Sequence, residues 1–240
     1  MNPIVLIPAR MAATRLPGKP LADIAGVPMI VRVLRQAQAA GVGPVVVAAG
    51  DAEIVAAVSA VGGRAVLTDP DLASGSDRIL AALSQIDPDG QHDAVINLQG
   101  DMPFVDPAVV RACADLLAAN PACDIATLVA PEDSPADRAN PDVVKAVVAA
   151  SGQALYFTRG ALYGEGPVLR HIGIYGYRRA ALAAFNVAPP SPLERREKLE
   201  QLRALELGLT IWTATIDDAP ISVDNPADLE RARDHARKTS

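Results

Sequence analysis

Three cationic side chains lie close together near the start of the chain. Arg10, Arg15 and Lys19 fall within ten residues, and no acidic residue appears before Asp23. The planar fork of an arginine matches phosphate oxygens, and a lysine supplies a point charge. The segment is not a Walker A loop, because Gly18-Lys19 is followed by proline and lacks both the first glycine and the serine or threonine. We therefore expect a phosphate-binding loop, with a solvated surface loop as the alternative.

Small polar residues and an arginine occur together at 74–78, which reads Ser-Gly-Ser-Asp-Arg. Serine hydroxyls, a glycine amide and an arginine at a helix start can bind a nucleobase or a phosphate. The same residues suit a helix cap, with Ser74 or Ser76 as the capping residue and Asp77 in the first turn. By itself the segment favours capping.

Two acidic residues follow apolar stretches at positions that suit metal binding. Asp101 comes directly after Gly100, and Asp224 follows Val223 and precedes Asn225. Carboxylates just past a buried strand can hold Mg²⁺ against phosphate oxygens. A turn-forming Gly-Asp pair and an ordinary acid at a helix start are the alternatives. The two acids form a metal pair only if the fold brings them together.

A strand-like segment in the second half of the chain carries polar and aromatic residues. Alternation places His171, Tyr175 and Tyr177 on one face of this strand and Arg170 on the other. A single histidine on a strand is more often structural than catalytic.

The first half of the chain alternates between strand-like and helix-like patterns. Short apolar runs bounded by proline and glycine indicate strands, and apolar residues at spacings of three and four indicate helices. This alternation predicts an α/β domain with a mainly parallel sheet flanked by helices. Ligands bind beyond the carboxyl ends of such strands, which points to the loops after Ile7, Thr68 and Leu98. We expect strands at 4–9, 44–49, 64–68 and 94–98, and helices at 28–40, 52–61, 76–86 and 107–119.

After Asp124 the pattern changes to strands with little helix between them, which predicts an antiparallel insertion. We expect strands at 125–130, 143–149, 154–158, 169–177 and 210–216, a loop at 131–141, and a last helix starting at 225–226.

A capping box predicts where helix returns. Ser191 and Glu194 have the required spacing, with Pro192 at the first helical position. The stripe of Leu199, Leu202 and Leu205 would be the buried side of this helix. By themselves, Glu200 and Gln201 suit solvent-facing positions.

The composition limits the classes of protein to consider. Lys and Arg number 22 and Asp and Glu 28, which gives a net charge of −6. This argues against a general nucleic-acid binder, which carries a basic surface, but leaves room for a local cationic pocket. No apolar run reaches the roughly 18 residues of a membrane span, and the N-terminus lacks signal-peptide features. We expect a cytoplasmic protein that binds neither nucleic acid nor membrane.

Cysteines and aromatic residues are few. We expect Cys113 and Cys123 to be small buried hydrophobes, since two isolated thiols cannot form a structural zinc site. Five of the eight aromatic residues lie within 22 residues: Tyr156, Phe157, Tyr163, Tyr175 and Tyr177.

Taken in order, the motifs resemble those of the CMP-KDO synthetases (3-deoxy-manno-octulosonate cytidylyltransferases). The resemblance spans nearly the whole chain, and the combination is far more specific than any single motif. It is carried by residues 7–10 (IPAR), 14–21 (TRLPGKPL), 74–78 (SGSDR), 97–101 (NLQGD), 154–159 (ALYFTR), 170–177 (RHIGIYGY), 191–194 (SPLE), 199–203 (LEQLR) and 223–229 (VDNPADL).

The resemblance implies a Rossmann-like nucleotidyltransferase fold with a smaller β-rich dimerisation lobe. It implies an Mg²⁺-dependent homodimeric enzyme that couples CTP to 3-deoxy-D-manno-octulosonate (KDO), giving CMP-KDO and pyrophosphate for lipopolysaccharide biosynthesis. On this basis residues 1–124 form the nucleotide-binding core, and residues 125–190 form the β-rich sugar-binding and dimerisation lobe. Residues 191–240 return to the core and supply a metal ligand.

Each matching motif also contributes residues to an expected site. An arginine is a suitable partner for the carboxylate of a sugar acid. By the resemblance, the catalytic residues are Arg10, Arg15, Lys19 and Asp101; the nucleotide-binding residues are Ala9, Arg10, Lys19, Ser74, Gly75, Arg78 and Gln99; the sugar-binding residues are Arg159, His171, Tyr175, Glu200 and Gln201; and the metal ligands are Asp101 and Asp224.

Two features depart from the family pattern. Met102 stands where the family usually has an acid, and the segment between Arg159 and Arg170 is short where many relatives carry a longer loop over the sugar. Both bear on the sugar acid rather than on the reaction type, so the alternative is the same reaction on sialic acid or amino-KDO. A catalytically silent nucleotide-binding protein would need Asp101 or Asp224 to be misplaced.

Overall fold

The structure is a computed structural model that describes residues 1–13, 15–162 and 164–239. Thr14 of the cationic segment and Tyr163 of the aromatic group therefore lie outside the described residues. The chain folds as two compact units, one made of residues 1–111 and 220–240 and the other of residues 112–219. No helix within the described ranges is long and apolar enough to cross a membrane.

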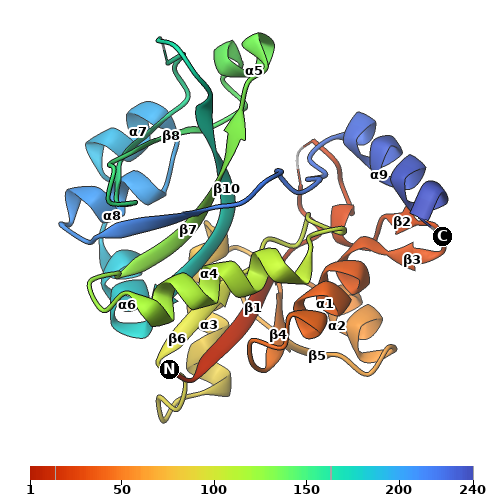
Figure 1. Ribbon diagram of the computed structural model, residues 1–240. Coiled ribbons are helices and arrows are strands. Elements are labelled where there is room, and N and C mark those ends of the chain that lie inside the picture. The colour runs from red at the N-terminus through yellow and green to blue at the C-terminus, as the bar shows by residue number, and fades with distance from the viewer. Residues whose placement is uncertain (14, 163, 240) are drawn as a thin grey trace. The chain divides into compact units, whose positions relative to one another are not determined.

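The first unit contains the expected parallel strands. The order is β6 (Ala94–Asn97), β1 (Pro3–Ala9), β4 (Val45–Ala49) and β5 (Arg64–Leu67), and each neighbouring pair is parallel (Figure 1). The side chains of β1 and β6 are almost all buried, because helices cover a parallel sheet on its faces. This confirms the predicted α/β class, with strand ends within one residue of those expected.

The helices of the first unit follow the predicted apolar spacing. They are α1 (Met29–Ala40), α2 (Ala52–Ser59), α3 (Gly75–Ile86), the start of α4 (Pro107–Ala119) and α9 (Pro226–Thr239). Gly41 ends α1 in the left-handed conformation, with φ 65°, which glycine adopts without strain. Two elements of this unit were not predicted: the short helix η1 (Lys19–Leu21) and the hairpin of β2 (Asp23–Ile24) and β3 (Val27–Pro28).

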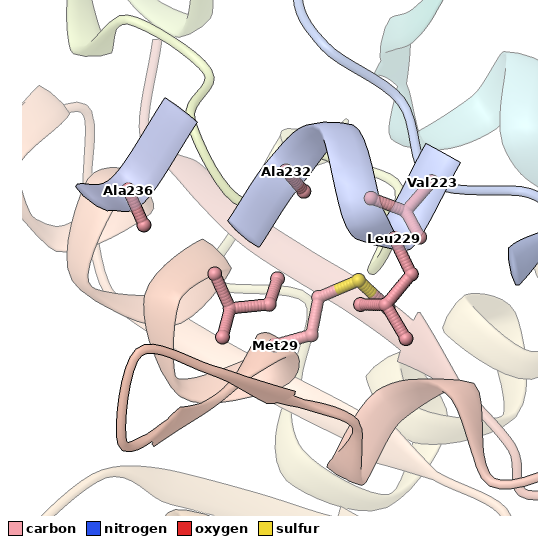
Figure 2. Close-up of a cluster of buried hydrophobic side chains, with 6 residues drawn as sticks. Met29, Val223, Leu229, Ala232 and Ala236 are labelled. Carbon is pink, nitrogen blue, oxygen red and sulfur yellow. The ribbon is translucent and has the colours of Figure 1, made fainter. Parts of the chain in front are cut away.

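An apolar cluster attaches the C-terminal segment to the rest of the first unit. Figure 2 shows side chains of α9 and the residues before it facing the start of α1. The cluster places residues 220–226 against the first unit, although they follow β5 and β6 by more than a hundred residues. Its buried members are Ile24, Met29, Val223, Leu229, Ala232 and Ala236.

The second unit contains the predicted antiparallel strands. The long strand β10 (Val168–Arg178) pairs antiparallel with β7 (Ile125–Glu132) and with β8 (Lys145–Val148), and β8 pairs with β9 (Ala154–Thr158). The pairing of β10 with β7 is interrupted by a register shift between Ile172 and Tyr175. The strand β11 (Ile211–Thr215) runs parallel to β7.

The units differ from the expected division at residues 124 and 190. Residues 220–240 belong to the first unit, as expected for a C-terminal return, but residues 191–219 belong to the second. The physical reason is pairing, because β11 hydrogen-bonds to β7, α8 packs beside β9, and α7 packs against α8.

The helices of the second unit were predicted less well. Both α5 (Pro135–Ala139), expected as loop, and α6 (Arg179–Val187) were missed. The single helix expected after Ser191 is wrong, because Lys198, with φ 55°, separates α7 (Pro192–Glu197) from α8 (Gln201–Glu206). Gln201 is buried rather than solvent-facing.

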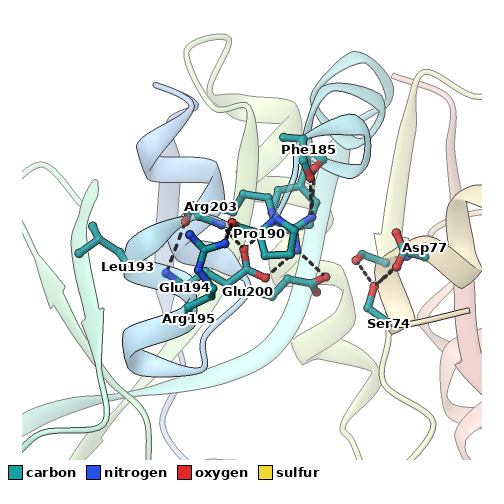
Figure 3. A network of polar contacts seen from close by, with 12 residues as sticks. Ser74, Asp77, Phe185, Pro190, Leu193, Glu194, Arg195, Glu200 and Arg203 are labelled. Carbon is teal, nitrogen blue, oxygen red and sulfur yellow. Dashed lines mark hydrogen bonds and ion pairs between the residues drawn. The ribbon is translucent and has the colours of Figure 1, made fainter.

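A buried arginine holds the ends of these helices together (Figure 3). Arg203 donates to both carboxylate oxygens of Glu194, at 2.8 and 2.7 Å, and to the carbonyl oxygens of Phe185 and Ala188. Burial acts to raise the pKa of Glu194, but hydrogen bonds from Arg203 and from the Ser191 N–H outweigh it, so the pKa is lowered. The capping box is confirmed, with both of its hydrogen bonds present.

Both cysteines are buried, as predicted. Burial raises the pKa of Cys123 to about 11, and that of Cys113 further still. Both thiols therefore stay protonated at neutral pH and act as small apolar groups.

Removing the cap should destabilise the second unit measurably. We expect Ser191→Ala to lower the free energy of unfolding by about 1 kcal/mol, since the Glu194 N–H loses its acceptor. Ser59→Ala, at an exposed position within α2, is the matched control and should leave stability unchanged or slightly higher. Urea unfolding of the three proteins measures this, and equal loss in both variants would contradict the assigned role of the cap.

Candidate active site

A cavity of about 300 Å³ lies within the first unit. Its walls come from the loops after β1 and β6, the start of α3 and the segment before α9. All the predicted nucleotide, phosphate and metal residues line it: Ala9, Arg10, Arg15, Lys19, Ser74, Gly75, Arg78, Gln99, Asp101 and Asp224. The structure therefore brings together residues that the sequence could place only separately.

Lys19 joins the two acidic residues of the cavity. Its Nζ donates to Asp101 Oδ2 at 2.8 Å and to Asp224 Oδ1 at 3.3 Å. Arg15 Nη2 forms a second ion pair with Asp224 Oδ1 at 3.2 Å, between side chains that are 63% and 42% exposed. The backbone N–H of Val223 donates to the Asp101 carbonyl at 3.0 Å, which holds the segment carrying Asp224 beside the end of β6.

Burial controls the electrostatics of Asp101. Burial raises its pKa, the nearby charge and hydrogen bond of Lys19 oppose this, and the charge of Asp224 adds to the increase, leaving the pKa raised. Two carboxylates this close repel each other unless a cation lies between them. In this structure that cation is the Lys19 ammonium.

The donor set at this point fits a divalent cation. Carboxylate oxygens of Asp101 and Asp224 face one ammonium group, and such oxygens are the ligands that Mg²⁺ prefers. Across the described ranges, no group of three or more His, Cys, Asp or Glu side chains is arranged to hold a metal. Mg²⁺ at this pair would therefore take its remaining ligands from phosphate and water, as it usually does.

Arg78 is completely buried beside the cavity. Its guanidinium donates to Thr68 Oγ1 at 2.7 Å and to the carbonyl oxygens of Asp69 and Pro70 at 2.9 and 3.1 Å. Burial lowers its pKa, with a further contribution from the charge of Arg10. These bonds fix the loop after β5 against α3.

Glycines let the backbone approach this arginine and the first strand. A Cβ on Gly50 would lie 2.8 Å from Arg78 Nη1, and one on Gly100 would lie 2.9 Å from the Pro8 carbonyl oxygen. Both distances are too short for a real side chain. The two glycines therefore allow strand ends and the arginine to pack closely around the cavity.

The start of α3 combines both functions considered for its residues. Ser74 caps the helix, accepting from the Asp77 N–H at 3.1 Å, and its hydroxyl also contacts Ser76 and Asp77 (Figure 3). The capping interpretation is thus confirmed, and Ser74 and Gly75 also line the cavity. An N-terminal helix end of this kind favours an anion.

An acid that the sequence analysis did not select holds the cationic loop. Asp51 Oδ2 accepts from the Met11 N–H at 2.7 Å, while the Met11 carbonyl accepts from the N–H groups of Ala13 and Gly18. Arg10, next to this anchor, donates to the Leu72 carbonyl at 3.4 Å. The missed signal is that Asp51 follows a strand and a glycine, as Asp101 does.

The predicted sugar-binding residues lie in the second unit, two of them within a row of rings. His171 contacts Phe157 edge-on at 5.0 Å and Tyr175 at 5.4 Å, and Tyr175 contacts Tyr177 at 5.8 Å. This confirms that the three side chains of β10 share a face. Burial raises the pKa of Tyr175 and of Tyr177, and Glu200 adds to both increases, so both hydroxyls stay protonated.

The hydrogen bonds around Thr127 determine the tautomer of His171. The Thr127 hydroxyl lies 3.1 and 2.9 Å from the carbonyl oxygens of Ile172 and Ile174, which only accept. Its proton therefore goes to a carbonyl, and its oxygen accepts from His171 Nε2 at 3.0 Å. Burial lowers the pKa of His171 to about 3, so the ring is neutral, with Nδ1 as an acceptor.

The remaining predicted sugar residues have structural contacts. Arg159 donates to the carbonyl oxygens of Glu197 and Pro141, and Glu200 lies 3.4 Å from Arg203. Gln201 is 7% exposed. Met102, the departure next to Asp101, is buried and so contributes apolar packing.

Comparison with known proteins adds the family. The family model described as Cytidylyltransferase matches residues 4–211. Proteins named 3-deoxy-manno-octulosonate cytidylyltransferase are 58% identical in Parvibaculum lavamentivorans and 60% identical in Rhodospirillum centenum, each covering 97% of this chain and 92% of the relative.

Solved structures are also similar to this chain. A CMP:2-keto-3-deoxy-manno-octonic acid synthetase complexed with CTP is 38% identical, with a TM-score of 0.94 and complete coverage of both chains. A nucleotidyl transferase from Methanothermobacter thermautotroptrophicus, at 18% identity and a TM-score of 0.65, shares the fold.

The partly buried, neutral histidine should make the protein sensitive to acid. The His171 pKa rises from about 3 when folded to about 6.5 when unfolded, so the unfolded state binds more protons between these values. Stability is full above pH 6.5 and falls as the pH drops, by at most about 1.4 kcal/mol per pH unit. Between pH 7 and 5, His171→Gln should lose about 1–2 kcal/mol less unfolding free energy than the wild type. Equal losses in urea unfolding would contradict the partly buried, neutral ring.

Proposed function

This chain belongs to the cytidylyltransferase family, and we propose that it couples CTP to KDO, giving CMP-KDO and pyrophosphate. The observation that carries the proposal is the cavity in which Lys19, Arg10 and Arg15 lie with Asp101 and Asp224. Three cations suit a triphosphate, and two carboxylates facing one cation suit a phosphate-bound metal. Relatives named for this sugar acid, at 58 and 60% identity, favour KDO over sialic acid or amino-KDO.

The first unit would bind CTP. Arg10 and Lys19 neutralise the triphosphate, and the amides at the start of α3 favour the same charge. Gln99 Nε2 donates to Asn97 Oδ1 at 3.3 Å, which leaves Oε1 to accept from the cytosine amino group. Ala9, Ser74, Gly75 and Arg78 complete the walls around the nucleoside.

The acidic pair would hold Mg²⁺. Lys19, which now neutralises both carboxylates, would then be released to the phosphates. When bound, the metal would neutralise phosphoryl charge and lower the pKa of the attacking hydroxyl. Asp101 and Asp224 are its proposed ligands, and Arg15 remains an ion-pair partner of Asp224.

The second unit would bind the sugar acid. Arg159 provides N–H donors for its carboxylate, and neutral His171 provides Nδ1 as an acceptor for a sugar hydroxyl. The Tyr175 hydroxyl, Glu200 and Gln201 complete the proposed sugar contacts.

The reaction is a single displacement at phosphorus. The anomeric oxygen of KDO forms a bond to the α-phosphorus of CTP, the bond to the bridging oxygen breaks, and pyrophosphate leaves. The residues of this chain are required to orient two substrates and to neutralise charge, without becoming covalently modified. We further propose that the protein acts as a cytoplasmic homodimer in lipopolysaccharide biosynthesis. The family resemblance supports this.

A substrate panel tests the proposed function. Purified protein with CTP and Mg²⁺ should release pyrophosphate with KDO, and release it more slowly or not at all with sialic acid and amino-KDO. A coupled pyrophosphate assay measures the rates. No release with any acid would overturn the enzymatic function, and preferential release with sialic acid or amino-KDO would replace the substrate.

The acidic pair gives a second test. Asp101→Asn and Asp224→Asn should each lower kcat at least about tenfold, which corresponds to about 1.4 kcal/mol of barrier, because an amide lacks the charge that a divalent cation needs. Asp115→Asn, at an exposed position on α4, is the matched control and should keep the wild-type rate. Wild-type turnover in either site variant would remove that residue from the proposed metal site.

A further inference from the structure

Both backbone polar groups of Arg159 are held by ionisable side chains. Its N–H donates to Glu197 Oε2 at 2.9 Å, and its carbonyl oxygen accepts from Lys145 Nζ at 3.0 Å. Lys145 belongs to β8 and Glu197 ends α7, so two separate elements fix this one residue at the end of β9. The peptide groups on both sides of the Arg159 side chain are thereby fixed in direction.

The Arg159 side chain is also held by hydrogen bonds, one to Glu197 and one to the turn at residues 140–141. Its Nε donates to the Glu197 carbonyl oxygen at 3.1 Å, and its Nη1 donates to the Pro141 carbonyl oxygen at 2.9 Å. Lys145 Nζ makes its second hydrogen bond to the Asn140 carbonyl oxygen at 3.0 Å, so it holds the same turn. A guanidinium has five N–H donors, and these two bonds use two of them. Within the described residues the other three make no hydrogen bond, and they are enough for the paired contact that a carboxylate accepts.

Lys145 is an unexpected residue at its position. It is completely buried on β8, and its ammonium hydrogen-bonds to two carbonyl oxygens. In the described part of the chain, no carboxylate lies within ion-pair distance of it. Burying such a charge is costly, and an apolar side chain of similar length would avoid that cost. Accordingly, burial lowers the pKa of Lys145, with Arg159 adding to the decrease and Glu197 opposing it.

Glu197 makes contacts that converge on the same residue. Besides the Arg159 N–H, its carboxylate accepts from Thr158 Oγ1 at 3.1 Å and lies 3.5 Å from the Tyr156 hydroxyl. It therefore contacts two side-chain hydroxyls and one backbone N–H within residues 156–159, at the end of β9. Lys145 thus holds the carbonyl group of Arg159, and Glu197 holds its N–H.

We propose that Lys145 and Glu197 are positioning residues that hold the Arg159 guanidinium in the orientation that binds the carboxylate of the sugar acid. Neither residue touches the substrate in this assignment, because each acts through Arg159. The proposal rests on the proposed function, in which Arg159 binds that carboxylate.

A double-mutant cycle with Arg159 distinguishes positioning from general structural support. Lys145→Met keeps the approximate length and the apolar stem of the side chain but removes the ammonium, and Glu197→Ala removes the carboxylate. Each is made in the wild type and in Arg159→Ala, and the KM values for KDO and CTP, kcat and the melting temperature are measured. Glu206→Ala is the matched control, because Glu206 accepts from the Leu193 N–H of α7 but makes no recorded contact with Arg159 within the described residues.

Each positioning variant should raise the KM for KDO at least about tenfold and change the KM for CTP less than about twofold. In the Arg159→Ala background the same substitutions should have no further effect on the KM for KDO, because residues that act through one group are not additive. Glu206→Ala should leave both KM values unchanged, whatever it does to the melting temperature.

Two results would overturn the proposal. One is an unchanged KM for KDO in both positioning variants, and the other is a full additional increase in the Arg159→Ala background. If Lys145→Met does not fold, the Glu197→Ala cycle decides by the same criteria. A wild type that releases no pyrophosphate with KDO would overturn the proposed function together with this inference. An active wild type with unaffected variants would overturn the inference alone.

Discussion

The contact of Lys19 with two carboxylates organises the cavity of the first unit. Asp101 follows β6 and Asp224 precedes α9, and one ammonium group lies 2.8 and 3.3 Å from them. Without a cation between them, the two acids would repel each other, and burial already disfavours the charged form of Asp101. The cavity is therefore built around a place that must hold positive charge.

That contact depends on apolar packing elsewhere in the first unit. Residues of α9 and the segment before it pack against Met29 (Figure 2) and against Ile24. The Val223 N–H donates to the Asp101 carbonyl oxygen. Burial of side chains of this size contributes about 1.5–3 kcal/mol each. The apolar core therefore stabilises the position of Asp224 more than its ion pairs do. The exposed ion pair with Arg15 contributes little. The carboxylate of Asp224 is therefore positioned in the cavity by the packing of Leu229 and Met29.

The sequence predicted local structure well and spatial convergence poorly. Alternating apolar patterns located the strands and helices of the first unit within about two residues, and the Ser191 capping box was confirmed, because these signals lie within a few residues of each other. The break at Lys198 was missed because a leucine stripe continues across it, and a left-handed lysine has no sequence signature. Asp51 and Lys145 were missed because their partners, Met11 and Arg159, are distant in sequence. Residue types and spacing singled out the cationic loop, residues 74–78, Asp101 and Asp224, and the family resemblance added Ala9 and Gln99 and assigned the roles.

The proposal that Asp101 and Asp224 hold a divalent cation in exchange for Lys19 can be measured without turnover. Mn²⁺ substitutes for Mg²⁺ at oxygen ligands, and electron paramagnetic resonance reports the free ion. Titrating Mn²⁺ into the protein with CTP should show one tight site in the wild type and at least about tenfold weaker binding in Asp224→Asn. Equal Mn²⁺ affinity in the two proteins would contradict the account, since the charge of Asp224 would then serve only its ion pairs within the protein.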